Sequence, residues 1–549
     1  MTPPAVPAHR LAAALVRLAD VFVVVAIGAG VYLLFAQLAW NGSTWDERVD
    51  FNIAADFVRN GSFLSNRADP TQSRLPHLVG AAALALFGEN LWAFKLPFAA
   101  AGLLAGLLLW RFVAARHGRA AATAVLAFCL TNPWLLGSAR SAATAGDVLV
   151  VLTTFAFFAV AVRLFETRGE PAPSLRAAAL LGVVAGLAVG AKLTSGVLLP
   201  AGFVLVAALQ RSLRHLAVYA LLAGLIGLAT NPLLLVQPES FAGALRRASG
   251  SLAIDPALLA PPAAAVAGTA DGAPVAAPLP PVSLEAPPKL RYLAALLVGK
   301  LTLPFLGFVA LGVAVGLAAA WRTRRFDPAF WGALALVVAT CAVPIWKDKQ
   351  NANYFLPLLL PAATLAAGVL GAARRSPRPW CRAAVALAWV TVPAFQLWLC
   401  AGLAPDYLQA GRRLGPQAQG LMAGPAVNHC QGGPLLIARL NELRRREGFD
   451  ADVFARVRVF ETCIAVLLHD VRVGPVAPAG FSFVDHRHVV ASREPYLLVV
   501  HDVIRHYHWG SPRHAVRNRH LDRLVRSCEV VPGRAGNERW EIYHCPGPA

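Results

Sequence analysis

Long apolar runs separated by arginine clusters constrain this chain more than any other feature of its sequence. The first run, from Leu11 to Trp40, is longer than the hydrophobic region of a signal peptide and is not followed by a small-residue cleavage pattern. With 57% hydrophobic and only 15% charged residues, the chain is too apolar for a soluble domain. The sequence therefore predicts a polytopic membrane protein that keeps its first span.

The net charge of +20 reflects topology rather than a nucleic-acid partner, because the arginines are not gathered in one basic domain. Each cluster lies between two apolar runs, as the positive-inside rule expects of cytoplasmic loops. The clusters are Arg111/Arg116/Arg119, Arg163/Arg168/Arg176, Arg211/Arg214, Arg322/Arg324/Arg325 and Arg374/Arg375/Arg378/Arg382.

Two consecutive cytoplasmic clusters must be joined by an even number of spans. This parity predicts about eleven spans, with the amino terminus inside and the carboxyl terminus outside the membrane. The predicted spans are 13–39, 90–113, 119–136, 144–166, 177–191, 194–210, 216–236, 291–320, 329–345, 352–373 and 382–403. The segment Pro76–Gly88 is too short to cross and is predicted as an interfacial helix. The run between Arg176 and Arg211 predicts a short hairpin with Lys192 at its tip.

The composition divides the chain into a membrane domain, residues 1–403, and an extracytoplasmic tail, residues 404–549. The membrane domain contains a first outer loop at 41–89 and a further outer loop at 237–290, which is Pro/Ala-rich low complexity over 254–288. The tail combines a helix-like segment at 435–457 with strand-like runs at 496–504 and 540–545. Its four cysteines fit a compartment that permits disulfides. The predicted fold class is a mostly α membrane bundle with a small C-terminal α/β domain.

Polar residues near the membrane lie mainly at the predicted outer ends of the spans. A charge at the centre of a bilayer costs about 2.5–3.5 kcal/mol, so such residues either reach water or pair. Solvated interface residues would explain each one singly, but a lysine embedded in a short apolar hairpin favours a cavity that opens to the outer face. The residues are Asp46, Glu47, Asp50, Arg67, Arg74, Arg140, Asp147, Lys192, Gln237, Glu239, Lys347, Asp348, Lys349 and Tyr354.

Such a cavity has the parts that sugar transfer from a lipid phosphate requires. Carboxylates can orient and deprotonate a hydroxyl or amine nucleophile. Lysine and arginine can bind a phosphate and stabilise it as a leaving group.

Several motifs occur in an order that resembles a known superfamily. They are "WDE" after the first span, "SRLPHLVGAAALALFGEN", "NPWLLGSARSAATAGD", "GLAVGAKLTSGVLLPAG", "NPLLLVQPESF" and "NYFLPLLLPAATLAAG". Over roughly residues 10–400 the chain is similar to the protein O-mannosyltransferases and lipid A aminoarabinose transferases. These are glycosyltransferases of the C fold that use polyprenyl-phosphate sugars.

The resemblance implies a set of site residues. Asp46 would be the general base of a single displacement that inverts the anomeric carbon, with Glu47 beside it. The family's Lys-Pro-Pro corresponds to Arg74-Leu75-Pro76, which keeps the cation but loses the first proline. Donor-phosphate ligands would then be Arg74, Lys192, Lys347 and Lys349, with Arg140, Asp147 and Tyr354 also in the site.

Other functions remain open at this stage. A transporter or flippase of a lipid-linked or anionic substrate is the main alternative, although such proteins place polar residues near the bilayer midplane. A non-catalytic relative whose tail is a binding module is another. No ligand spacing requires a metal, and the family leaves a divalent metal open as a cofactor. The expected partners are a polyprenyl-phosphate sugar, membrane lipid and a glycan, lipid or protein acceptor.

Overall fold

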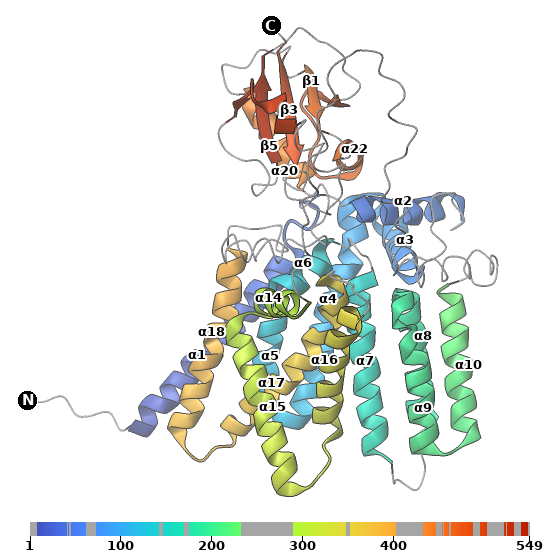
Figure 1. Ribbon diagram of the computed structural model, residues 1–549, viewed down its shortest axis with the longest axis vertical. Helices are drawn as coiled ribbons and strands as arrows, with labels where there is room; N and C mark the ends of the chain where they lie inside the picture. Colours follow the sequence, from blue (N-terminus) through green and yellow to red (C-terminus); the bar gives the residue numbers. More distant parts are fainter. Residues whose placement is uncertain are drawn as a thin grey trace, which may run out of the picture.

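The computed structural model contains a bundle of apolar helices with a small α/β domain at one end (Figure 1). It describes residues 8–40, 42, 45–61, 73–141, 146–168, 175–231, 289–346, 352–401, 432–445, 453, 455–460, 463–486, 495–501, 521–522, 524–531 and 540–546. The Pro/Ala-rich loop predicted at 237–290 therefore lies outside the described residues up to position 288.

The helices of the bundle follow the apolar runs. They are α1 (Ala8–Phe35), α2 (Trp45–Asn60), α3 (Leu75–Phe87), α4 (Leu91–His117), α5 (Arg119–Thr131), α6 (Pro133–Ser141), α7 (Gly146–Glu166), α8 (Leu175–Ala191), α9 (Leu198–Gln210), α10 (Leu213–Ala229), α14 (Lys289–Leu301), α15 (Leu303–Thr323), α16 (Pro328–Trp346), α17 (Leu359–Arg374) and α18 (Pro379–Cys400). Two 3-10 turns, η1 (Leu193–Val197) and η3 (Ala352–Leu358), precede α9 and α17.

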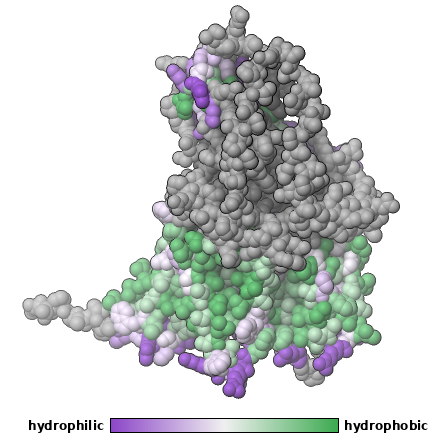
Figure 2. All heavy atoms as spheres, viewed as in Figure 1, coloured by the Kyte–Doolittle hydropathy of each residue, from purple (hydrophilic) through white to green (hydrophobic). Residues whose placement is uncertain are grey.

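The prediction of a multi-pass membrane protein is confirmed. Among the described helices, six are long and apolar enough to cross a bilayer, or seven if the bent pair α5 and α6 is one span. Shorter apolar helices stand where the remaining spans were predicted, namely α8, α9, α10 and α16. The visible face carries a hydrophobic belt with hydrophilic residues along its lower margin (Figure 2). We call that margin the basic end, because Arg119, Arg324 and Arg374 mark helix termini there. We call the opposite end the outer end, after the topology predicted from the sequence.

Two predicted spans are broken rather than continuous. The segment predicted as one span at 291–320 is two helices, α14 and α15, separated at Thr302, whose φ is +73°. Pro304 follows two residues later, and proline removes a helical hydrogen bond and crowds the preceding turn. The span predicted at 119–136 bends by 57° between α5 and α6. There the Asn132 Oδ1 accepts from the backbone N–H of Trp134 at 3.0 Å, which starts a new helix.

The two breaks meet inside the bundle. The side-chain amide of Asn132 donates to the carbonyl oxygen of Lys300 at 3.0 Å. Near the end of α5, the Thr131 hydroxyl donates to the Gln396 Oε1 of α18 at 2.8 Å. The side chains of Asn132 and Thr131 at the first break thus find partners within protein, as a membrane interior requires.

A stripe of glycines brings α8 against α10. A Cβ atom at Gly182 would lie 2.6 Å from the carbonyl oxygen of Tyr219, and one at Gly186 would lie 2.8 Å from the Cβ of Ile226. Small residues four positions apart allow this close approach of two membrane helices. The packing fixes α8, which leads to Lys192 at the outer end.

The C-terminal domain confirms the predicted α/β tail. Among the residues that the structure describes, its strands are β1 (Arg456–Val459), β2 (Ser482–Asp485), β3 (Tyr496–His501), β4 (Glu529–Val530) and β5 (Trp540–Cys545), in the order β2-β1-β3-β5-β4. β1 runs parallel to β2 and β3, whereas β5 is antiparallel to β3 and β4. Helices α20 (Gly433–Arg445) and α22 (Ile464–Val473) accompany this sheet.

One detail of the tail prediction is wrong. The segment 435–457 was predicted as helical, but its end is strand β1, where β-branched valines alternate with arginines. The strand-like runs at 496–504 and 540–545 contain β3 and β5 as expected. A disulfide joins Cys528 to Cys545.

Candidate functional site

Helix α2 lies across the outer end of the bundle, directly after α1 (Figure 1). The chain turns between the two helices through Gln37, with φ of +52°, and Gly42, with φ of +66°. Arg140 holds this turn. Its guanidinium is buried and donates to the carbonyl oxygens of Leu33, Leu34, Ala36 and Gln37. The predicted site residue Arg140 therefore caps the carboxyl end of α1, where unpaired carbonyls attract a cation.

Glu47, in the first turn of α2, is fully buried and pairs with Lys95 of α4. The Lys95 Nζ lies 3.1 Å from the Glu47 Oε1, and neither side chain reaches solvent. The same ammonium donates to the carbonyl oxygen of Gly42 at 2.6 Å. Lys95 thus fixes both the turn before α2 and the first turn of the helix.

Asp46 precedes Glu47 in the same turn of α2. Its side chain lies outside what the structure describes, but its backbone is helical. The amino-terminal end of a helix carries a partial positive charge, so carboxylates at this position are electrostatically favoured. The backbone therefore places Asp46 next to an anchored Glu47 at the outer end.

A second buried pair joins α2 to α3. The His77 Nε2 lies 2.9 Å from the Asp50 Oδ1, and both side chains are nearly inaccessible. Glu47, Asp50 and the buried Phe51 lie on one face of α2, three or four residues apart. This face is directed into the bundle.

Arg74 is buried at the start of α3. Its backbone N–H donates to the Asn231 Oδ1 at 3.3 Å, and the adjacent Ser73 hydroxyl donates to the carbonyl oxygen of Val189 at 3.1 Å. Val189 lies three residues before Lys192. The structure therefore brings the Arg74 segment against the tip of the hairpin that carries Lys192.

Lys192 lies at the hairpin tip and pairs with Asp147, in the first turn of α7. The Nζ lies 2.7 Å from the Asp147 Oδ1, with 28% of the lysine side chain exposed and 3% of the aspartate side chain exposed. Asp147 also faces the positive end of its own helix. Two of the predicted site residues are thus in direct contact.

The remaining predicted residues lie outside what the structure describes, either as whole residues or as side chains. Lys347 and Lys349 lie outside the described residues, as does the side chain of Tyr354, whose backbone is part of η3. Within the described ranges, no three His, Cys, Asp or Glu side chains are close enough to hold a metal ion.

Helix α22 of the C-terminal domain contacts the turn and helix that carry Asp46. The His469 ring packs edge-on against Phe51, with centroids 4.9 Å apart, and Arg472 donates to the Asn52 Oδ1 at 2.9 Å. The buried Asp470 carboxylate lies so close to Gly42 that a Cβ there would be 2.5 Å from its Oδ2. The C-terminal domain is therefore in contact with the candidate catalytic loop.

Two residues of this arrangement, His77 and Lys95, were not predicted, and Asp50 was predicted only as one of the polar residues at the outer ends of the spans, without a role in the site. Lys95 had a signal in the sequence, because it is a lysine within the apolar run "LWAFKLPF", and a charge in such a run needs a partner. Asp50 and His77 are 27 residues apart, and no periodic pattern links them.

A protein-family model described as dolichyl-phosphate-mannose-protein mannosyltransferase matches residues 75–235. The match includes Arg74's helix α3, Asp147 and Lys192, and it ends near Asn231. No curated protein sequence matches the chain.

Solved structures extend the comparison to nearly the whole chain. ArnT from Cupriavidus metallidurans bound to undecaprenyl phosphate superposes with a TM-score of 0.50 and 16% identity, over 96% of this chain and 99% of that one. The apo state of the same protein gives a TM-score of 0.50 and 17% identity, over the same shares. This chain has the glycosyltransferase C fold. At this identity the likeness shows the fold alone.

Proposed function

We propose that this C-fold protein transfers a sugar from a polyprenyl-phosphate donor to an acceptor at the outer face of a bacterial cytoplasmic membrane. The convergence of carboxylates and cations from separate helices at the outer end carries the proposal. The Glu47–Lys95 and Asp147–Lys192 pairs join α2 to α4 and α7 to the hairpin tip. The description of the matching family and the undecaprenyl phosphate bound to ArnT support a lipid-phosphate donor.

The two carboxylates at the start of α2 have different environments. Glu47 is buried and its carboxylate is paired with the Lys95 ammonium. We therefore assign Glu47 to positioning the turn rather than to proton transfer. We assign the general base to Asp46. It would accept the proton of the acceptor hydroxyl or amine while that atom attacks the anomeric carbon. The bond from the anomeric carbon to the phosphate oxygen breaks in the same step, which inverts the configuration.

The leaving polyprenyl phosphate departs with the electron pair of that bond. Its developing charge needs cations at the outer end. Lys192 has an exposed fraction of 28%, and an ammonium with three N–H donors can contact a carboxylate and a phosphate at once. We assign Lys192 and Arg74 to the donor phosphate, together with Lys347 and Lys349 before Tyr354. The lipid tail would lie among the helices.

The position of these pairs disfavours the transporter alternative. Secondary transporters bind substrate near the midplane of the bilayer. Glu47 and Asp147 instead lie in the first turns of α2 and α7, at the end of the bundle that carries the C-terminal domain (Figure 1). The proposed acceptor is a glycan, a lipid or a protein. Transfer is to be measured both with and without a divalent metal.

The test compares Asp46→Asn with the unmodified protein. Cells with and without the gene are first compared by mass spectrometry of envelope glycolipids and glycoproteins, which identifies the product. We expect Asp46→Asn to abolish that product, while the purified variant still binds undecaprenyl phosphate. Asp56→Asn on the same helix is the control and should leave the product unchanged. A normal product from Asp46→Asn would contradict the assigned base, and no glycan change on gene loss would contradict the transfer itself.

A further inference from the structure

A cavity of about 280 Å³ lies at the basic end of the bundle, away from the candidate active site. It is formed by α1, α5, α17 and α18, and its size is near the lower limit of small-molecule sites, about 300 Å³. Polar groups come from Asp20, Thr123, Arg119, Arg374 and Arg382, and the larger apolar groups from Val23, Val24, Leu370, Val385 and Trp389.

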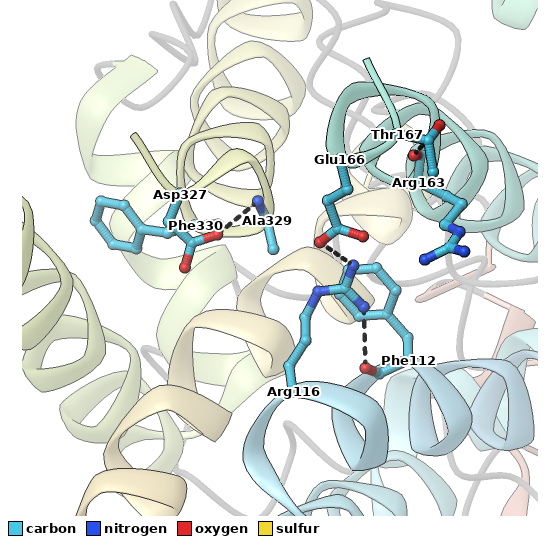
Figure 3. A network of polar contacts seen from close by, with 8 residues as sticks. All are labelled: Phe112, Arg116, Arg163, Glu166, Thr167, Asp327, Ala329 and Phe330. Carbon is cyan, nitrogen blue, oxygen red and sulfur yellow. Dashed lines mark hydrogen bonds and ion pairs between the residues drawn. The ribbon is translucent and has the colours of Figure 1, made fainter. Parts of the chain in front are cut away.

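The charge of the cavity is positive. Arg374 forms an ion pair with Asp20, so these two side chains neutralise each other. In the described part of the chain, Arg119 and Arg382 make no ion pair, and both are exposed. Arg116, three residues before Arg119, shows the contrast. Its guanidinium lies 2.6 Å from Glu166 of α7 and covers the Phe112 ring (Figure 3). Two cations at the cavity are thus available to an anion.

The rest of the cavity wall is apolar, and its rim reaches the exposed surface of α1. Val24 on its rim is 60% exposed on a helix of the bundle, where the surroundings are lipid chains. The indole N–H of Trp389 already donates to the carbonyl oxygen of Ala124 at 3.1 Å, so the ring offers the cavity its carbon surface. A soluble anion would gain nothing from such a wall, whereas a lipid would bury its first methylenes there.

We propose that this cavity binds the headgroup of an anionic phospholipid of the inner leaflet. Arg119 and Arg382 would bind the phosphate, and the acyl chains would follow α1 and α18. The positive-inside rule assigns the basic end to the cytoplasm, and basic pockets between membrane helices on that side fit anionic headgroups. The site does not depend on the proposed transfer reaction, because it lies at the opposite end of the bundle.

The experiment uses the purified full chain in a neutral detergent and measures lipid retention by native mass spectrometry and protection against thermal unfolding. The probes are phosphatidylglycerol, phosphatidylcholine and inorganic phosphate. Phosphatidylglycerol should bind and raise the melting temperature, while the other two should not. Arg119→Gln/Arg382→Gln should weaken phosphatidylglycerol binding roughly thirtyfold, because two basic residues near an anionic lipid together contribute about 2 kcal/mol.

A matched variant separates this site from general surface charge. Arg322→Gln/Arg325→Gln removes two exposed arginines of the basic end outside the cavity and should retain the lipid effect. Arg119→Lys/Arg382→Lys keeps the charge and should bind, which excludes misfolding as the cause. Equal loss in both Gln variants, equal protection by phosphatidylcholine, or equal protection by inorganic phosphate would each overturn the proposal.

Discussion

Lys95 is the cation that connects the turn after α1 to the candidate catalytic helix. Its ammonium contacts the Gly42 carbonyl oxygen and the Glu47 carboxylate, and both charged side chains are fully buried. A buried pair of this kind gives little net stability, but removal of one partner leaves an uncompensated charge. The pair therefore matters mainly because it fixes where α2 begins.

Replacement of Lys95 by Met should lower the free energy of unfolding by about 3–5 kcal/mol, because Glu47 remains buried without its cation. The double variant Lys95→Met/Glu47→Gln should recover most of this loss. Thermal unfolding in detergent measures both. If the double variant is as unstable as the single one, the stability comes from lysine packing and not from the charge pair.

Lys192→Met should weaken undecaprenyl phosphate binding by roughly tenfold or more, since a hydrogen bond to a charged group contributes about 1.5–3 kcal/mol. Lys192→Arg keeps the cation beside Asp147 and should retain most of the binding. Binding is measured by native mass spectrometry, with Arg214→Gln at the basic end as the control. Unchanged affinity in Lys192→Met would remove this lysine from the donor site.

The roles of some of these residues could be predicted from the sequence and those of others could not, for physical reasons. Lys192 could be predicted because a charge stands alone in an apolar hairpin, and the structure places it at the tip. The role of Arg140 could not, because its partners are main-chain carbonyls of α1, which no side-chain pattern reveals. The Asp50–His77 pair depends on how α3 packs on α2, and this tertiary contact between two helices is not visible in the local sequence pattern.

At the scale of elements, α22 couples the C-terminal domain to the candidate catalytic loop. Its Asp470 carboxylate lies against Gly42 and also against Gly433, the first residue of α20, whose positive helix end favours an anion. Val473 at its end joins the hydrophobic core of the bundle. A displacement of α22 would therefore be transmitted to the turn before Asp46.

Two glycines provide a matched test of this contact. Gly42 and Gly61 flank α2 with φ values of +66° and +65°, so alanine strains the backbone equally at both, by about 1 kcal/mol. Only at Gly42 would the new Cβ meet Asp470, since nothing lies within 4 Å at Gly61. Gly42→Ala should therefore lower both melting temperature and transfer rate more than Gly61→Ala. Equal effects would show that α22 does not constrain the turn.

At the scale of the whole molecule, the positive-inside pattern predicts which end faces the cytoplasm. The chain provides its own probe, because Cys381 at the start of α18 is the exposed one among its described free cysteines. A membrane-impermeant maleimide should label inverted vesicles and leave intact spheroplasts unlabelled, with Cys381→Ser as the control. Labelling of spheroplasts at Cys381 would reverse the assigned orientation.

Most of the whole-molecule architecture follows from the sequence, since hydropathy and arginine position are sufficient to place the helices. Hydropathy and arginine position do not show whether a span is one continuous helix or two. The apolar run around Thr302 and the one around Asn132 both satisfy a length criterion, although each is two helices. Pro304 and Pro133 carried the signal for both breaks.

The contact between these two breaks imposes an order on biosynthesis. The Asn132 amide donates to a carbonyl 168 residues further along the chain. At about 5–20 residues per second, the ribosome needs roughly ten to thirty seconds to supply that acceptor. During this interval the early helices must stay in the translocon or close to water. The packing of α5 and α6 is therefore completed only after α14 has been synthesised. A pause in translation between Asn132 and Lys300 would prolong exposure of the Asn132 amide to lipid.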